Sequence, residues 1–201
     1  MSGEPSTAPV FPAEMRVRLA RRDPAALALF FDAFFDRVYA YLRRLVADEH
    51  LAEDLTQDVF LQAHRALASY DPARDPRPWL FTIATNKLRD HWRARAARGE
   101  NREASLDQEE LGALALGLPP PPDQLPSSEE LVTRVRAAIQ ALPEGLRATV
   151  LLRVYEGLSF EDIGRILERN EVATRKRYSR ALGALRDALG ELWKQSVEGP
   201  R

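Results

Sequence analysis

The basic residues near the end of the chain are the side chains whose type and spacing most directly suggest chemistry, namely binding to nucleic acid. Residues 165–186 contain seven Arg and Lys residues and only two acidic ones, Glu168 and Glu171. Because the whole chain has a formal net charge of −1, this positive excess is local. Clustered cations bind phosphate backbones, and Arg can also read a guanine edge. A solvated helix face is the alternative explanation, but the one-sided charge favours DNA contact.

The residues around these charges predict a helix-turn-helix that would carry them. Ser159 is a good N-cap with Asp162 three residues later, and Asn170 can cap a second helix after the turn at 168–170. The apolar positions are Ile163, Ile166 and Leu167 in the first helix and Tyr178, Ala181, Leu182 and Leu185 in the second, whose other sides carry Arg175, Lys176, Arg177 and Arg180. This layout is typical of a motif that reads DNA.

Composition argues against several other kinds of chemistry. The 201 residues are 45% hydrophobic and 29% charged, which is ordinary for a soluble globular protein. The chain has no cysteine, and its histidines (His50, His64 and His91) lack metal-ligand spacing. A Gly-rich phosphate loop and a nucleophile elbow are also missing, so we expect no metal, no cofactor and no enzymatic activity. Neither a membrane-length apolar run nor a secretory signal is present, so we expect a cytoplasmic protein without membrane insertion.

Helical periodicity and the lack of strand-like alternation predict an all-α fold of two helical domains joined by a flexible linker. Four consecutive prolines, Pro119–Pro122, cannot sit inside a helix and mark the linker, which is also rich in acidic residues. The predicted parts are a disordered tail (1–12), a helical domain (13–98), an acidic, proline-rich linker (99–128), a helix-turn-helix domain (129–197) and a short tail (198–201).

The first domain contains a second basic segment. Asp23 followed by Pro24 is a typical helix start, and a second helix is predicted over about 51–68. The first helix is expected to turn Leu27, Phe30, Phe31, Phe34, Val38, Tyr41, Leu42 and Leu45 inward. A third helix begins at Trp79, after a turn-rich loop at 69–78, and becomes basic towards its end. A basic helix beside an aromatic-bearing loop suits opening DNA. Trp79 and Trp92 can equally be core residues.

Two strings in this domain, AEDLTQDVF (52–60) and WLFTIATNKLRD (79–90), carry a resemblance to a known family. With them, the chain resembles the extracytoplasmic-function (ECF) group of bacterial RNA polymerase sigma factors. The first domain resembles sigma region 2 and the second, with RKRYSRAL at 175–182, resembles region 4. The resemblance implies an alternative sigma factor that binds core polymerase and directs promoter recognition, DNA opening and transcription initiation.

The resemblance also implies partners and roles for particular residues. The partners would be core RNA polymerase through its beta and beta-prime subunits, promoter DNA and, as for many family members, an anti-sigma factor. Polymerase would be bound by Asp54, Gln57 and Asp58. At the −10 element, Ser69 and Tyr70 would hold a flipped base, Trp79 and Asn86 would help strand separation, and the backbone phosphates would be held by Lys87, Arg89 and Arg93. The −35 element would be bound by Arg175, Lys176, Ser179 and Arg180.

Some features leave alternatives open. The helix-turn-helix turn carries Glu168 and Arg169 where the family usually has Gly and an apolar residue, and the next helix begins with residues 172–174, Val-Ala-Thr, in place of Gly-Thr-Val. The acidic linker would either mimic nucleic acid near the polymerase cleft or act as a plain tether. A stand-alone helix-turn-helix regulator, which would bind DNA as a dimer without polymerase, is the main alternative function. A helical protein-interaction adaptor is the third.

Overall fold

The computed structural model describes residues 11–46, 48–99 and 128–190, and all of the regular structure in these ranges is helical. The predicted all-α fold is therefore confirmed. The elements are α1 (Ala13–Ala20), α2 (Pro24–Leu45), α3 (Glu49–Ala66), the 3-10 turn η1 (Leu67–Ser69), α4 (Pro76–Ala97), α5 (Ser128–Ala141), α6 (Glu144–Val150), the π-helical turn η2 (Leu151–Tyr155), α7 (Phe160–Leu167) and α8 (Glu171–Leu189). The predicted linker lies outside the described residues except at its ends, 99 and 128, as do residues 1–10 and 191–201.

Aspartate caps fix where the three long helices of the first domain begin. Each carboxylate accepts a hydrogen bond from a backbone N–H in the first turn of its helix, which would otherwise have no partner. The bonds run from Ala26 to Asp23 (3.0 Å), from Leu51 to Asp48 (3.2 Å) and from Arg77 to Asp75 (2.8 Å). Pro24 and Pro76 occupy first-turn positions, where a missing N–H costs nothing. The predicted start of α2 at Asp23–Pro24 is confirmed.

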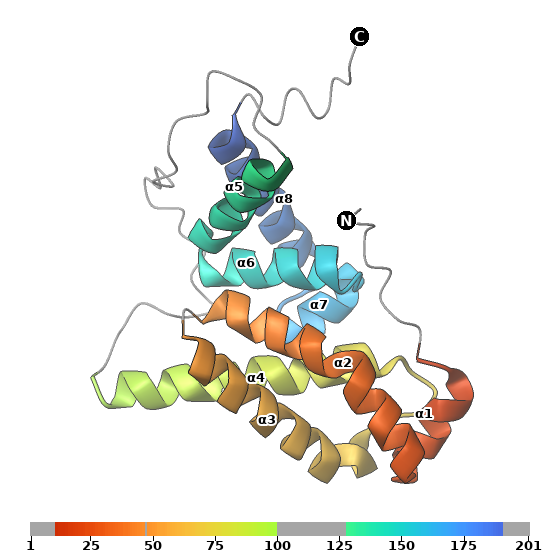
Figure 1. Ribbon diagram of the computed structural model, residues 1–201. Helices are drawn as coiled ribbons and strands as arrows, with labels where there is room; N and C mark the ends of the chain where they lie inside the picture. The colour runs from red at the N-terminus through yellow and green to blue at the C-terminus, as the bar shows by residue number, and fades with distance from the viewer. Residues whose placement is uncertain (1–10, 47, 100–127, 191–201) are drawn as a thin grey trace.

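Helices α2, α3 and α4 pack into a bundle with α1 against one end (Figure 1). Its centre is built from apolar side chains at helical spacing, among them Phe34, Val38, Leu42, Val59, Leu80, Phe81 and Leu88, none of which is exposed. Phe11 lies within the segment expected to be a disordered tail. It is nevertheless 5% exposed, and its ring packs 5.8 Å from Phe30 and 5.9 Å from Phe34. An aromatic side chain therefore fastens residue 11 to the bundle.

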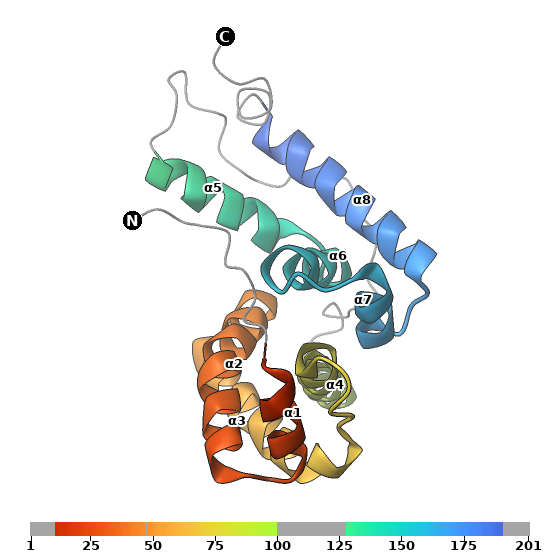
Figure 2. The ribbon, with the colours of Figure 1, turned by 90° about the vertical axis from the view of Figure 1, so that its right-hand side faces the viewer.

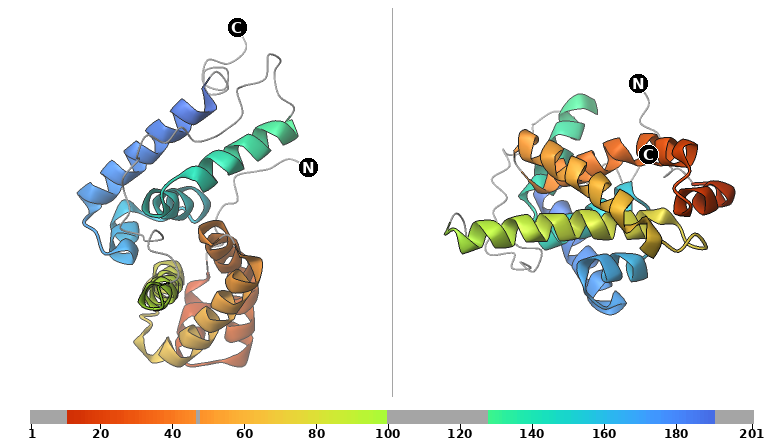
Figure 3. Two further views of the ribbon diagram at one scale, coloured as in Figure 1. Left: turned by 90° about the vertical axis from the view of Figure 1, so that its left-hand side faces the viewer. Right: turned by 90° about the horizontal axis from the view of Figure 1, so that it is seen from below.

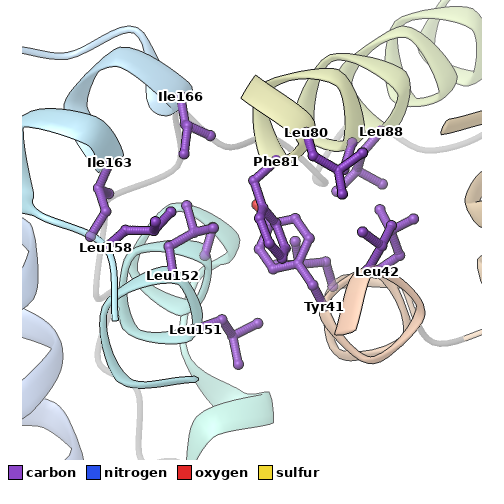
Figure 4. Close-up of a cluster of buried hydrophobic side chains, with 14 of the residues drawn as sticks. Tyr41, Leu42, Leu80, Phe81, Leu88, Leu151, Leu152, Leu158, Ile163 and Ile166 are labelled. Atoms are coloured by element: carbon purple, nitrogen blue, oxygen red, sulfur yellow. The ribbon is translucent and has the colours of Figure 1, made fainter. Parts of the chain in front are cut away.

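Helices α5 to α8 form a second bundle that rests on the first (Figures 1 and 2). Helix α7 lies against α4, and α6 lies against α2, as the views from below and from the side also show (Figure 3). Figure 4 shows the apolar part of this junction, where Phe81 of α4 faces Leu151 and Leu152 of the second bundle. The Phe81 ring meets Tyr41 edge-on at 5.3 Å. One continuous apolar core therefore joins the two domains.

The two phenylalanines Phe31 and Phe34 allow a matched test of this core. We expect Phe34→Ala to lower the free energy of unfolding by about 3–5 kcal/mol, because it empties a fully buried position. Phe31→Ala should cost about 1 kcal/mol or less, because that side chain is 44% exposed. Urea denaturation followed by circular dichroism measures both values. Equal losses would contradict the packing described.

Candidate nucleic-acid interface

Two side-chain caps define the helix-turn-helix. The Ser159 hydroxyl accepts from the Asp162 backbone N–H at 3.0 Å and donates to the Asp162 carboxylate at 2.7 Å. The Asn170 side-chain oxygen accepts from the Ala173 N–H at 2.8 Å. Both predicted caps are confirmed. They start α7 and α8 on either side of a three-residue turn and so fix the orientation of the second helix.

The turn itself depends on a close approach of two backbone segments. The Arg169 N–H donates to the Gly164 carbonyl at 2.8 Å, and a side-chain carbon added at Gly164 would lie 2.6 Å from the Arg169 carbonyl oxygen. Glu168, which ends α7, has a left-handed backbone conformation with φ 56° and ψ 45°. Glycine adopts this conformation without steric cost, whereas glutamate does not. The departure from the usual glycine therefore leaves the turn intact but strained.

Helix α8 presents one basic face to solvent. The four residues predicted to bind the −35 element, Arg175, Lys176, Ser179 and Arg180, are all exposed. The opposite face buries Thr174, Arg177, Ala181 and Leu185. Arg177, which the sequence pattern placed on the polar side, is only 1% exposed, so that placement was wrong. Its position explains the error, because residue 177 is three after Thr174 and four before Ala181 and shares their helix face.

Arg175 is held in place before any partner arrives. Its Nε donates to the Glu171 carboxylate at 3.1 Å, one turn earlier on α8. Its guanidinium also lies 4.8 Å from the centre of the Phe160 ring, and the Arg153 guanidinium lies 4.6 Å from the same ring. Cation–π contact and an ion pair restrict the rotamers of a long side chain. Less conformational entropy is then lost when the side chain binds a partner.

The loop before α4 places its two predicted site residues differently. Ser69 is exposed, and its hydroxyl donates to the Ala66 carbonyl at 2.7 Å. Tyr70 is 5% exposed, its hydroxyl donates to the Arg74 carbonyl at 2.8 Å, and its ring lies 5.2 Å from Trp79. Burial raises the pKa of Tyr70 to about 12. Tyr70 therefore supports the loop from inside, and the half-buried Trp79 connects it to α4.

A hollow of about 600 Å³ separates this loop from α7. Its wall on the side of the first domain includes Ser69, Tyr70, Trp79 and Thr82, and its wall on the other side consists of Glu161, Asp162 and Arg165. A single base would fit a space of this size. The structure thus brings Ser69, Tyr70 and Trp79 together at one site, and α7 faces that site with Glu161 and Asp162, both of which are ion-paired with Arg165.

The predicted phosphate-binding cations of α4 are engaged within the protein. Arg89 donates to the side-chain oxygen of Asn86 at 3.1 Å and to Glu168 of the second domain at 2.8 Å. Lys87 lies 3.6 Å from Asp58, and Arg93 lies 3.3 Å from Asp90. Asn86 and Arg93 are exposed, whereas the Arg89 side chain is 13% exposed. Among the ion pairs of Lys87, Arg89 and Arg93 given above, only that of Arg89 has its partner in the second domain.

The acidic face of α3 lies beside an apolar groove that the sequence did not reveal. Asp54, Gln57 and Asp58 are exposed and share one helix face with Leu61, which is 56% exposed. The groove holds about 180 Å³ and is lined by Leu27, Phe30, Phe31, Phe60, Ala63, His64 and Leu67. Phe31 was expected to point inward, and that expectation was wrong, because it lies at the rim beside Phe35 and Phe60.

A buried carboxylate joins the domains near the end of η2. Glu156 is 4% exposed and accepts from Arg37 Nε at 2.9 Å. Arg37 also donates to the Tyr155 carbonyl at 2.7 Å, and Arg77 donates to the Glu156 carbonyl at 3.0 Å. Burial raises the pKa of the Glu156 carboxyl above its ordinary value, while Arg37 acts in the opposite direction. Helices α2 and α4 therefore both contribute a guanidinium to one buried segment of the second domain.

Comparison with known proteins identifies the two domains. Residues 30–98 match Sigma-70 region 2, and residues 133–185 match Sigma-70, region 4. The RNA polymerase sigma-H factor of Pseudomonas aeruginosa is 31% identical over 181 residues, which cover 89% of this chain and 94% of that protein. The ECF RNA polymerase sigma factor SigK of Mycobacterium sp. (strain KMS) is 30% identical over 177 residues, covering 86% of this chain and 88% of that protein. The chain belongs to the ECF group of RNA polymerase sigma factors.

The activity of this sigma factor follows from that membership. It is an alternative sigma factor that binds core bacterial RNA polymerase and directs promoter recognition, DNA opening and transcription initiation. Its partners are core polymerase and promoter DNA. The solved structure of CnrH in complex with the cytosolic domain of CnrY has the same fold, with a TM-score of 0.62 over 89% of this chain and 97% of that one, at 24% identity. Within residues 11–46, 48–99 and 128–190, no helix has the length and apolarity to cross a membrane.

The close contact at Gly164 gives a test of the helix-turn-helix geometry in this sigma factor. Gly164→Val should lower the free energy of unfolding by about 1–3 kcal/mol, because the added atoms meet the Arg169 carbonyl. Gly183→Val is the matched control on α8, where an added Cβ would meet nothing within 4 Å, and it should leave stability nearly unchanged. Thermal and urea unfolding measure both. A stable Gly164→Val protein would show that the turn is not constrained in this way.

Proposed function

We propose that this sigma factor divides its work among three separate surfaces on α3, α4 and α8. The observation that carries the proposal is that each of these three helices exposes one set of the predicted binding residues: Asp54, Gln57 and Asp58 on α3, Asn86 and Arg93 on α4, and Arg175, Lys176, Ser179 and Arg180 on α8. On α3, Asp54, Gln57 and Asp58 would bind the beta-prime subunit of polymerase. The acidic groups suit a basic partner, and the exposed Leu61 together with the groove at Phe31 and Phe60 supplies the apolar area that protein interfaces need.

The −10 element would bind along α4 and the loop before it. Ser69, Tyr70 and Trp79 would form the pocket for a flipped base. Unstacking the base costs a few kcal/mol, and contacts in the pocket would offset this cost. Asn86 lies two turns after Trp79 on the same helix and would help keep the strands apart. The cations Lys87, Arg89 and Arg93 would hold phosphates. Each of them has a carboxylate partner within the protein that DNA would replace.

The −35 element would bind the exposed face of α8. Arg175 would hydrogen-bond to a base edge in the major groove. Its contacts with Glu171 and Phe160 already restrict the orientation of its guanidinium. Lys176, Ser179 and Arg180 would bind the backbone and set the position of the helix. Each of the two domains would bind DNA weakly by itself. When polymerase fixes the spacing of the domains, the second DNA contact becomes intramolecular, so the two domains together bind the promoter effectively.

We further propose that the protein acts in the cytoplasm, that it is not an enzyme, and that an anti-sigma factor is among its partners. Two solved structures with this fold are complexes with a second protein: CnrH with the cytosolic domain of CnrY, and RpoE with the anti-sigma factor NepR from Bartonella quintana. The second has a TM-score of 0.62, at 22% identity over 81% of this chain and 95% of that one. The exposed apolar groove on α2 and α3 is a surface that a partner protein would cover.

The direct test of the proposal is transcription by purified bacterial core polymerase on DNA fragments from the region upstream of its own gene, with and without this protein. Discrete start sites that require the protein support the proposal. Gel filtration of the protein with core polymerase is the companion measurement. The absence of both start sites and binding would favour a stand-alone regulator.

The polymerase surface is tested by removing charge from α3. Asp54→Asn with Asp58→Asn should weaken binding to core polymerase by about tenfold or more, because charged partners at an interface lose their counterparts. The control is Glu14→Gln with Asp187→Asn, which removes the same charge from exposed positions on α1 and α8. Fluorescence anisotropy of labelled protein titrated with core polymerase gives both affinities. Equal affinities for the two double variants would place the docking surface elsewhere.

The −35 surface is tested at Arg175. Arg175→Ala should reduce discrimination at one −35 base pair by about 1–3 kcal/mol, while binding to core polymerase stays unchanged. Arg186→Ala removes an exposed cation from the last turn of the same helix and should alter little. Initiation rates on a promoter and on its single-base −35 variants measure the effect. Unaltered discrimination in Arg175→Ala would assign the reading of that base to another residue.

A further inference from the structure

One ion pair joins the proposed −10 surface to the turn of the helix-turn-helix. Arg89 Nη1 of α4 donates to the Glu168 carboxylate at 2.8 Å and to the Asn86 side chain at 3.1 Å. The Arg89 side chain is 13% exposed, whereas that of Glu168 is 71% exposed. A DNA phosphate would need the same guanidinium that the Glu168 carboxylate now holds.

Glu168 makes this contact from a backbone conformation that disfavours glutamate. Its φ of 56° lies in the left-handed region, where glycine has no steric penalty. The neighbouring bond from Arg169 to the Gly164 carbonyl uses backbone atoms alone, so the turn does not require a glutamate side chain. What glutamate adds over glycine at this position is a carboxylate that reaches α4.

The surrounding contacts keep Glu168 in reach of Arg89. Arg37 binds the buried Glu156 carboxylate, and Arg77 binds the Glu156 backbone carbonyl. The apolar core also continues from α4 into η2 (Figure 4). Helix α7 lies along α4 and covers the hollow at Ser69 and Trp79. In this arrangement the second domain covers part of the α4 surface on which the −10 element would bind, at Arg89 and at the hollow, while Asn86 and Arg93 stay exposed.

The same arrangement cannot exist on a promoter. The −35 and −10 elements lie about 25 base pairs apart, which is about 85 Å at 3.4 Å per base pair. Helix α8 has 19 residues and is therefore about 28 Å long, and its first turn adjoins the helix that touches α4. The domains must separate before both elements are bound. Residues 100–127 number 28 and, fully extended, would span about 95 Å, so the chain length allows this separation.

We propose that Glu168 is an intramolecular competitor of promoter DNA. In the free protein its carboxylate binds Arg89 and helps to hold the second domain closed over the −10 surface. A DNA phosphate replaces the carboxylate at Arg89 when the domains separate. The DNA half of this proposal rests on the proposed −10 role of Arg89, whereas the closed contact itself does not.

Closure is tested by energy transfer within the free protein, which has no natural cysteine. Asp32→Cys on α2 and Asp187→Cys on α8 place dyes at exposed positions outside the interdomain contacts described. Glu168→Gln keeps the backbone strain and removes the charge, and it should reduce the closed-to-open ratio about two- to fivefold, as expected for one partly exposed ion pair. Glu14→Gln is the control with equal charge change. Unaltered transfer in Glu168→Gln overturns the proposal.

The pairwise contact is isolated by a double-mutant cycle on the same signal. Arg89→Gln should open the molecule as Glu168→Gln does, and the second change should add nothing to the first. Fully additive effects would show that the two side chains act separately, and would overturn the proposal. Glu168→Gly, which also relieves the left-handed strain, should raise the unfolding temperature and yet open the molecule.

Competition with DNA is tested by fluorescence anisotropy with a 20-nucleotide single-stranded DNA of mixed sequence, because phosphate contacts do not depend on sequence. Glu168→Gln and Glu168→Gly should each bind this DNA about two- to fivefold more tightly than the parent protein, and the gain should vanish when Arg89 is Gln. An opened molecule without this gain would overturn the competition. That failure is distinct from failure of the proposed sigma-factor surfaces, which the transcription and core-binding assays measure separately.

Discussion

The burial of Glu156 between the two domains is the constraint on which their arrangement depends. A carboxylate with almost no exposure must have partners, since an unpaired buried charge is far more costly than a paired one. Arg37 from α2 and Arg77 from the first turn of α4 reach this segment. They hold η2 against both helices, so α7, which follows directly, lies along α4, and α8 extends away from the first domain (Figure 2). The basic face of α8 is exposed to solvent.

The three proposed surfaces of the sigma factor differ in their accessibility in this arrangement. The acidic face of α3 and the basic face of α8 are exposed, so polymerase and duplex DNA can reach them without any change in the domains. The surface of α4 is partly covered by α7. A sigma factor that is closed in this way would offer its −10 surface fully only when other contacts separate the domains. Strong affinity of the free chain for DNA would then be unnecessary, in keeping with its nearly neutral charge.

Local signals in the sequence predicted local structure well and contacts between domains poorly. Asp23, Ser159 and Asn170 were recognisable as caps because capping depends on residues only two or three positions apart. The outward direction of Phe31 and the burial of Arg177 depend on which neighbouring helix covers each face, and helical spacing alone does not determine that. The ion pairs of Glu156 and Glu168 join residues 119 and 79 positions apart, and no periodic pattern marks such pairs.

The proposed surfaces require that one chain contacts two promoter elements, through α4 and α8. Because the chain lacks cysteine, a single cysteine carrying a photo-activated crosslinker can be placed at Asn86 or at Lys176. Each labelled protein is then mapped on promoter DNA in complex with core polymerase. Asn86→Cys should crosslink near −10 and Lys176→Cys near −35, about 25 base pairs upstream. Crosslinks from both positions within one half-site, or in symmetric pairs without polymerase, would contradict it.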